Sequence, residues 1–462
     1  MTVRQWRLLL PLAVLVAGGL IATSGALATE QQARQVKVAI MSDCKGAFGA
    51  HYENDIGGAQ AAFAQYAGGK PKSRSKPSAG MTGIKVGNTS VNIVGYGCGD
   101  DTAATAIKET RRLMEGLKAD VMVGPLSGDE AVTVANYAKT HPTKTFVIGT
   151  AGSQDPTMQI APKNVFRYHG DGAQWNAGLG EILYKRLGWR RAAIIMDDYS
   201  FGWTSAAGII ADFCAIGGTI TKRVFPPLNT TDYAPYAQQL PSPNQVDGYF
   251  WVVGGTGTGA SLKAFEQAKG KLKPNQLSGN LFLIDGAAAT EVAPLYVGSY
   301  VGGFGTAPGL KTRQAKRYEA VIAKWYGPAK LPAPSGFVYN YYNAAWALVR
   351  GLQGSAGATG AKLNASMPRT NASGYEISDK GNVKLDSRRQ AIQDQFQLRI
   401  GKGGVPSVVG FVPNVDQAFG GLFKPSSPPP GRTQPACVKM KLPWQGKICV
   451  VRNGAVTNQT IK

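Results

Sequence analysis

Three segments of the chain combine hydroxyl side chains with glycine directly after a short apolar run. They span residues 42–49, 124–130 and 149–155. In such segments hydroxyl and backbone N–H groups can approach a ligand closely, and a helix that begins there favours an anion such as a carboxylate. Ordinary strand-to-helix turns use the same residue types. It is therefore their succession, more than any one of them, that indicates a ligand-binding site.

Residue patterns typical of catalysis are missing from the sequence. The three histidines, His51, His141 and His169, are well separated, and no nucleophile elbow, phosphate-binding loop, zinc-protease motif or Cys/His cluster occurs. Residues 254–259 read Gly-Gly-Thr-Gly-Thr-Gly, but this spacing lacks the full dinucleotide-binding pattern. We therefore expect a binding protein that is not an enzyme and has no cofactor and no metal site.

Runs rich in Val and Ile alternate with Ala-rich amphipathic stretches, which predicts an α/β protein of doubly wound, mainly parallel sheets. One set of predicted elements comprises strands 36–41, 90–96, 121–124 and 145–149 and helices 53–66, 102–117 and 129–139. A second set comprises strands 191–196, 219–225, 247–253 and 281–285 and helices 173–187, 202–216 and 259–269. Open parallel sheets bind ligands beyond the carboxyl ends of their strands, where the three glycine-rich segments would meet. Two sets of elements in a chain of 462 residues predict two lobes.

The N-terminus has the layout of a secretory signal peptide. Arg4 and Arg7 precede an apolar run over 8–21, and small residues follow at Ala26 and Ala28. We predict a signal peptide over 1–28 and export across the cytoplasmic membrane to the periplasm or the extracellular space. An uncleaved membrane anchor is the alternative.

The five cysteines suit an oxidising compartment. Cys44 and Cys98 each follow a predicted strand, and Cys437 and Cys449 flank a short C-terminal segment. We predict two disulfides among these four and a free thiol at Cys214. Sequence leaves the connectivity open, and buried free thiols are the alternative.

The C-terminal residues read as a separate tail. Residues 425–430 are rich in Pro and Ser and predict a linker, so 426–462 would form this linker and a small disulfide-closed hairpin. Residues 70–79 predict a basic surface loop.

Positive charge dominates the chain, with 50 Lys and Arg against 28 Asp and Glu and a formal charge of +22. The basic residues are scattered and form no nucleic-acid recognition motif, so we expect no nucleic-acid partner. Attraction to an anionic envelope surface explains the charge better in an exported protein, and a merely solvated surface is the alternative.

The order of several segments resembles the branched-chain amino-acid (leucine/isoleucine/valine-type) family of periplasmic binding proteins, the substrate-binding subunits of ABC importers. The resemblance covers about residues 36–425. It rests on segments in matching order: 42–49, 120–130, 146–153, 193–202 (AIIMDDYSFG), 246–251 (VDGYFW) and 374–382 (GYEISDKGN).

The resemblance implies a site for a zwitterion. Ala151 and Ser153 match a backbone contact and a hydroxyl contact to the ligand's carboxylate, and Ser127 and Gly128 match the paired small residues after the third strand. Glycine at 128 stands where the family usually has a ligand-binding serine. The remaining matched positions are the ammonium-binding acid, Asp285, and two flanking aromatic residues, Phe48 and Phe201.

The ligand would be a small solute, most simply an amino acid, with an amide, a urea-like compound or a small carboxylate as alternatives. The resemblance further implies a monomer of two discontinuous lobes joined by three crossovers, lobe 1 over 36–168 and 303–370 and lobe 2 over 169–302 and 371–425. The lobes would close on the ligand for recognition by an ABC permease. A ligand sensor and a basic envelope-adhesion protein are the alternative functions.

Overall fold

The computed structural model describes residues 34–461 except 256, 274, 281–291, 333–334, 371–374 and 376–382. Residues 34–462 group into one compact unit. The predicted signal peptide, 1–28, and the predicted strand 281–285 with Asp285 lie outside the described residues.

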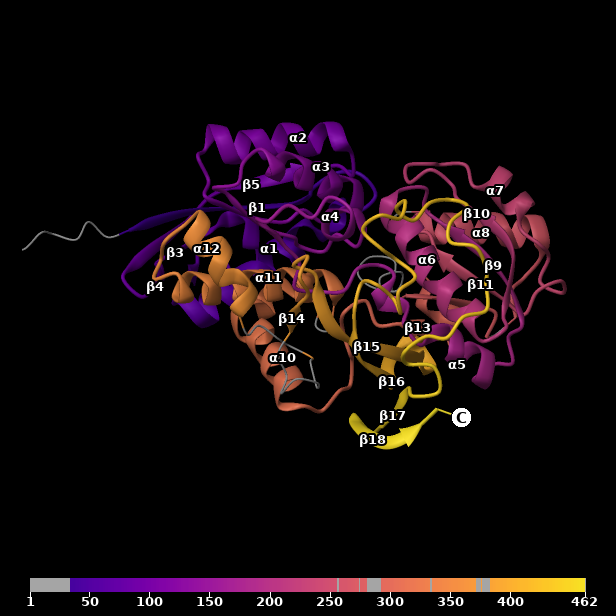
Figure 1. The fold of residues 1–462 in the computed structure, drawn as a ribbon. Helices are drawn as coiled ribbons and strands as arrows, with labels where there is room; N and C mark the ends of the chain where they lie inside the picture. The colour runs from indigo at the N-terminus through magenta and orange to yellow at the C-terminus, as the bar shows by residue number, and fades with distance from the viewer. Residues whose placement is uncertain are drawn as a thin grey trace, which may run out of the picture. The chain divides into compact units, whose positions relative to one another are not determined.

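The first sheet has six strands in the order β4-β5-β1-β6-β7-β8, and all pairs are parallel except β4 with β5 (Figure 1). Its strands are β1 Gln35–Asp43, β4 Ile84–Val86, β5 Thr89–Gly99, β6 Val121–Val123, β7 Thr145–Val147 and β8 Val165–Phe166. Its helices are α1 Tyr52–Ala67, α2 Ala103–Arg111, α3 Gly128–Lys139 and α4 Asp155–Met158. Central strands such as β6 are wholly buried, because helices cover both faces of a parallel sheet.

The second sheet has ten strands, and its order along the main path is β10-β9-β11-β12-β13-β15-β16-β17-β18. The strands from β10 to β13 pair in parallel, and those from β13 to β18 pair antiparallel. Its strands are β9 Arg191–Met196, β10 Thr219–Val224, β11 Gly248–Val252, β12 Leu277–Asn280, β13 Tyr300–Gly302, β14 Lys384–Leu385, β15 Ala391–Ile400, β16 Pro406–Val415, β17 Cys449–Arg452 and β18 Ala455–Thr460. Its helices are α5 Leu179–Arg186, α6 Ser200–Ala215, α7 Ala234–Gln239 and α8 Gly257–Lys269.

Three helices come after the parallel strands of the second sheet in the chain, but they pack on the side of the first sheet. They are α10 Arg313–Tyr326, α11 Gly336–Gly354 and α12 Ala361–Ser366. Helix α11 lies so close to α1 that a Cβ on Gly58 would stand 2.2 Å from the Val338 carbonyl oxygen (Figure 1). The described part of the chain therefore crosses three times between the part built on the first sheet and the part built on the second sheet. This number of crossings agrees with the predicted fold class.

Most predicted elements are present with boundaries shifted by a few residues, but two predicted helices are interrupted. Residues 173–187 form a 3-10 turn, Gln174–Asn176, and then α5, because Gly178 adopts φ +82° between them. Residues 102–117 form α2 followed by a π-helical turn, Arg112–Gly116. The predicted loop 70–79 contains strand β2, Lys70–Pro71, which pairs with β3, Met81–Thr82.

The disulfide prediction is partly wrong. Cys44 pairs with Cys98, but Cys437 pairs with Cys214, and Cys449 is the free thiol. Sequence spacing could not reveal this, because α6 brings Cys214 beside a segment 223 residues later in the chain.

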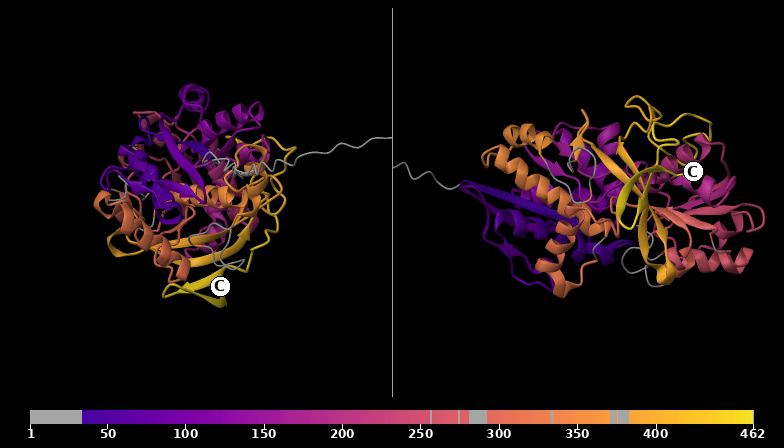
Figure 2. Two further views of the ribbon diagram at one scale, coloured as in Figure 1. Left: turned by 90° about the vertical axis from the view of Figure 1, so that its left-hand side faces the viewer. Right: turned by 90° about the horizontal axis from the view of Figure 1, so that it is seen from below.

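The C-terminal tail is part of the folded unit. Strands β17 and β18 extend the second sheet beyond β16, with β18 at its outer edge (Figures 1 and 2). The Trp444 indole is buried and donates to Asp212 Oδ1 at 2.7 Å. The predicted disulfide-closed hairpin between Cys437 and Cys449 does not form, and the tail's hairpin is instead β17 with β18, which sheet pairing attaches to β16.

Among the residues that the structure describes, no helix combines the length and apolar character that crossing a bilayer requires.

The disulfide pattern makes a first prediction. Peptide mapping without reduction should recover Cys214 linked to Cys437 and Cys449 alkylated. Removing the bond by Cys214→Ala with Cys437→Ala should lower the free energy of unfolding by about 2–5 kcal/mol, because the unfolded chain gains freedom. Cys449→Ala is the matched control and should leave the urea midpoint unchanged. A Cys437–Cys449 peptide would contradict the observed pairing.

Candidate functional site

A small cavity lies where loops of the first sheet meet α6 of the second. Six aromatic side chains dominate its wall. The lining residues are Phe48, Leu126, Gly128, Thr150, Gly152, Trp175, Tyr199, Phe201, Phe304 and Phe337. Four of them follow strands β6 and β7, so the first sheet's carboxyl edge carries the cavity as predicted. None of these lining residues bears a formal charge.

The Phe201 ring, on α6, packs against residues of the loops that line the cavity. A Cβ added to Gly152 would meet this ring at 2.7 Å, and one added to Gly172 would meet it at 3.1 Å. On its other side the ring centroid lies 5.9 Å from that of Trp175. A cavity of about 20 Å³ remains, which is room for about one water molecule. The described conformation therefore has no room for a ring-sized ligand, and such a ligand requires the cavity to widen.

Hydrogen bonds between elements of the two sheets accompany this packing. The Ser200 amide donates to Asp129 Oδ1 at 3.1 Å, and the Gln154 amide donates to Thr204 Oγ1 at 3.1 Å. One bond joins α6 to the start of α3, and the other joins α6 to the residue before α4. The described conformation is therefore a closed one.

Two buried polar groups in the cavity wall have no hydrogen-bond partner among the described residues. They are Thr150 Oγ1 and Trp175 Nε1. Buried donors are normally satisfied, so unpaired ones in a cavity wall suit a ligand that accepts hydrogen bonds. Gly128 is the first residue of α3, and the partial positive charge at the N-terminus of this helix favours an anion. This wall can bind an apolar ring and a hydrogen-bond-accepting head group.

The buried Arg167 guanidinium holds the loop that carries Thr150 and Gly152. Its Nη1 donates to the carbonyl oxygens of Ala151, at 3.1 Å, and Ser153. The pKa of Arg167 falls to about 10 because burial disfavours its charge, so it stays protonated at neutral pH. The loop's carbonyls therefore turn toward Arg167.

Three buried carboxyl groups cluster beneath this site. Asp43 ends β1, Asp101 accepts from the Phe48 amide at 3.4 Å, and Glu130 Oε1 accepts from the Asp100 amide at 3.2 Å. The neighbouring carboxyl groups of Glu130 and Asp101 disfavour the ionised form of Asp43 and add to the effect of burial on its pKa. Burial raises the pKa of Glu130 to about 8 and that of Asp101 to about 6, and it raises that of Asp43 strongly. Acids whose neutral forms are favoured make a poor cation site, and the described residues contain no group arranged to bind a metal.

The structure brings together some of the predicted site residues. Phe48, Gly128 and Phe201 line the cavity, and Ser127 is buried next to Gly128. Ser153 lies outside the lining, and its hydroxyl donates to the Gly128 carbonyl oxygen at 3.0 Å. Ala151 also lies outside the lining. All of them, with Asp285, stay predictions as ligand contacts.

Sequence reasoning missed most of the aromatic wall. Tyr199 lies in segment 193–202, which carries part of the family resemblance, so the sequence offered a signal for this residue. Trp175, Phe304 and Phe337 lie outside the three glycine-rich segments, and the fold of the chain brings them to the cavity.

The carboxyl cluster predicts that stability falls as the pH rises. The folded protein keeps protons that the unfolded chain loses near pH 4, so unfolding becomes easier up to about pH 8. His51, whose pKa burial lowers to about 4, and His169, lowered to about 3, act in the opposite direction, but only below about pH 6.5. Between pH 6.5 and 8 the free energy of unfolding should drop by about 1–2 kcal/mol.

Urea titrations across this range test the assignment. Glu130→Gln should flatten the slope, whereas Glu266→Gln on α8 should leave it unchanged. An equal slope in Glu130→Gln and the unmodified protein would show that Glu130 does not hold the proton.

Comparison with known proteins identifies the fold and the family. Residues 35–404 match the model of the family described as periplasmic binding protein. No curated protein sequence matches. A solute-binding protein of an ABC transporter from R. palustris, solved with benzoate, is 21% identical, with a TM-score of 0.67 over 83% of this chain and 98% of its own.

Two further structures have the same fold. An ABC transporter substrate-binding protein from Sphaerobacter thermophilus is 20% identical, with a TM-score of 0.67 over 83% of this chain and 99% of its own. A leucine-binding protein from Thermotoga maritima is 17% identical, with a TM-score of 0.64 over 82% and 99%. The family model spans most of the chain and confirms the predicted family and fold class. The chain therefore belongs to the periplasmic binding protein family, with the type I fold of the leucine-binding proteins.

Proposed function

We propose that the protein is the extracytoplasmic solute-binding subunit of an ABC importer, which binds a small molecule in the aromatic cavity and delivers it to a membrane permease. Family membership supports the binding role. The solved neighbours named as ABC transporter components support the transport role.

The proposed ligand is a small carboxylate with an apolar, ring-sized body, and an aromatic acid fits best. The observation that most directly supports this ligand class is the wall of six aromatic side chains. Two buried donors in this wall, Thr150 Oγ1 and Trp175 Nε1, have no partner among the described residues. Aromatic rings pack favourably against one another, and carboxylate oxygens accept from such donors. Neighbours solved with benzoate and with 4-hydroxybenzoate agree with this ligand class.

A hydrophobic amino acid is the second candidate. Neighbours named as leucine-binding and branched-chain amino-acid-binding proteins favour it. An ammonium group needs an acidic partner, and Asp101 and Asp197 both lie near Tyr199. Burial raises the pKa of each, which favours their neutral forms, so the predicted partner Asp285 is the more suitable acid.

Binding would proceed by opening and reclosing. Separation of α6 from the first sheet's loops withdraws Phe201 and frees the space between Gly152 and Trp175. A ligand ring then takes part of that space and contacts both sides, which stabilises the closed state through differential affinity. The closed state would be the form that the permease recognises.

The substitution Thr150→Val tests the site, because it removes the hydroxyl group and leaves the volume of the side chain nearly unchanged. It should weaken a benzoate-type ligand at least tenfold in calorimetry, because a hydrogen bond to a charged group contributes about 1.5–3 kcal/mol. Thr133→Val is the matched control, since its hydroxyl bonds within α3 to the Asp129 carbonyl. Equal affinity of both variants would remove Thr150 from the site.

Asp285→Ala separates the two ligand classes. A thermal-shift screen should first compare benzoate, 4-hydroxybenzoate, leucine and phenylalanine, because a ligand of the native state raises the melting temperature. If an amino acid binds, Asp285→Ala should weaken it more than tenfold, and Asp285→Glu should restore affinity. An aromatic acid should bind Asp285→Ala unchanged. No shift with any of the four compounds would contradict the proposed ligand class.

A further inference from the structure

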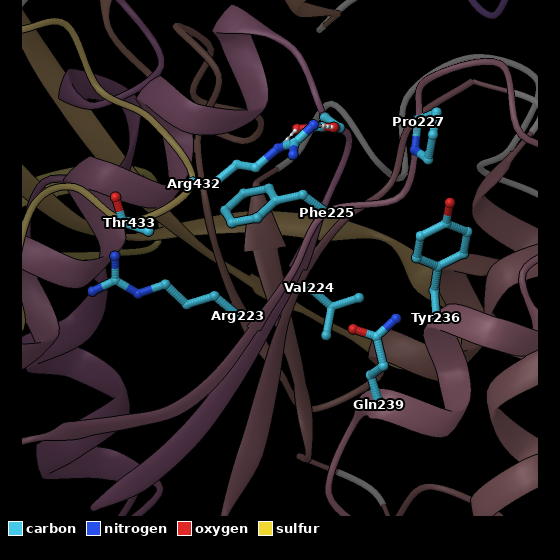
Figure 3. Close-up of a pocket in the computed structure, with 9 residues that line it drawn as sticks. Arg223, Val224, Phe225, Pro227, Tyr236, Gln239, Arg432 and Thr433 are labelled. Atoms are coloured by element: carbon cyan, nitrogen blue, oxygen red, sulfur yellow. Dashed lines mark hydrogen bonds and ion pairs between the residues drawn. The ribbon is translucent and has the colours of Figure 1, made fainter.

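A second and larger pocket lies on the second sheet's side of the molecule, at the edge strand β10. It has a volume of about 630 Å³, which is in the range of small-molecule sites. Its walls come from the end of β10, from α7 and from the tail after the Pro-rich segment (Figure 3). The lining residues are Asp198, Arg223, Val224, Phe225, Pro227, Tyr236, Gln239, Arg432 and Thr433. None of them lines the aromatic cavity.

The charged side chains of this pocket carry one positive charge more than negative charges. Arg432 forms a two-pronged ion pair with Asp198, through Nε at 2.7 Å and through Nη2. Arg223 has no carboxylate partner among the described residues, and its Nη2 donates to the Pro435 carbonyl oxygen at 2.8 Å. The pocket thus has a net charge of +1, which suits a monoanion.

The remaining lining residues divide the pocket by polarity. Figure 3 shows Arg223 and Thr433 at one side, Tyr236 and Gln239 at the other, and Val224 between them. Phe225 and Pro227 add further apolar surface. A ligand that fits would place a negative group at Arg223 and an apolar body over Val224.

The wall that carries Arg432 is firmly attached. The disulfide between Cys437 and Cys214 joins the tail to α6, and the bond from Arg223 to Pro435 lies between that disulfide and the pocket. Residues 432 and 433 follow the part of the chain that matches the family model, 35–404. The pocket is therefore built jointly by the family core and by an added segment.

We propose that this pocket is a second binding site, distinct from the aromatic cavity, for a small organic monocarboxylate with an apolar body. The Arg223 guanidinium binds the carboxylate, because its planar fork matches two carboxylate oxygens. Val224 and Phe225 contact the apolar body, and Tyr236 and Gln239 provide polar contacts at its far end.

The experiment uses 4-bromobenzoate as the probe and 4-bromobenzamide as its neutral analogue. Anomalous diffraction from soaked crystals locates the bromine, and calorimetry on the full chain measures affinity in solution. We expect bromine density beside Val224 and at least tenfold weaker binding of the amide at this site. Arg223→Gln should weaken the pocket's binding event at least tenfold, and Arg223→Lys should restore part of it.

Lys222→Gln is the matched control, since it removes the same charge from the neighbouring, exposed position of β10. It should leave affinity unchanged, and all three variants should keep the Cys214–Cys437 bond and the unfolding midpoint. Equal affinity of Arg223→Gln and Lys222→Gln, or density without binding in solution (binding at crystal concentration only), would overturn the proposal. Thr150→Val should leave the pocket's binding event intact, so failure of the cleft proposal and failure of this one are distinguishable.

Discussion

The buried guanidinium of Arg167 is the interaction on which the site's geometry depends. A buried charge is costly unless hydrogen bonds surround it, and Arg167 bonds to the cleft loop at Ala151 and Ser153, to Thr157 and to Gln390. Gln390 lies just before β15, and the backbone of Arg167 pairs there as well. One side chain thus ties the first sheet's binding loop to the segment that leads into the second sheet's antiparallel part.

The aromatic cavity wall helps to hold the elements of the two sheets together. Burying the Phe201 ring between Gly152 and Trp175 contributes roughly 1.5–3 kcal/mol to this packing. A ligand must outcompete this contact, which favours molecules that bring comparable apolar surface and also satisfy Thr150 and Trp175. The same wall disfavours small, strongly hydrated solutes, because they would leave the aromatic surface poorly packed. Selectivity and closure therefore have a common physical origin.

The C-terminal tail enlarges the part of the molecule that is built on the second sheet. Pairing of β16 with β17 lengthens the sheet, Trp444 fills a gap above Asp212, and a disulfide attaches the tail to α6. Arg432 neutralises Asp198, which precedes the cavity residue Tyr199 directly in the chain. The tail is therefore connected both to a pocket of its own and to the loop that forms part of the cleft.

The sequence by itself determined the fold class, because strand and helix periodicities are local and their alternation permits few arrangements. The strand ends of the first predicted sheet brought the segments that carry Phe48 and Gly128 to one edge, and the family resemblance added Phe201. Only the tertiary structure decided that Cys214 pairs with Cys437, that the tail joins the sheet, and that Trp175, Phe304 and Phe337 complete the cavity. These contacts join residues far apart in the chain, and local patterns do not encode which distant surfaces meet. The proposed ligand class rests on those contacts, because residues from distant segments make up the aromatic wall, and this wall suits an aromatic acid better than the zwitterion that the resemblance implies.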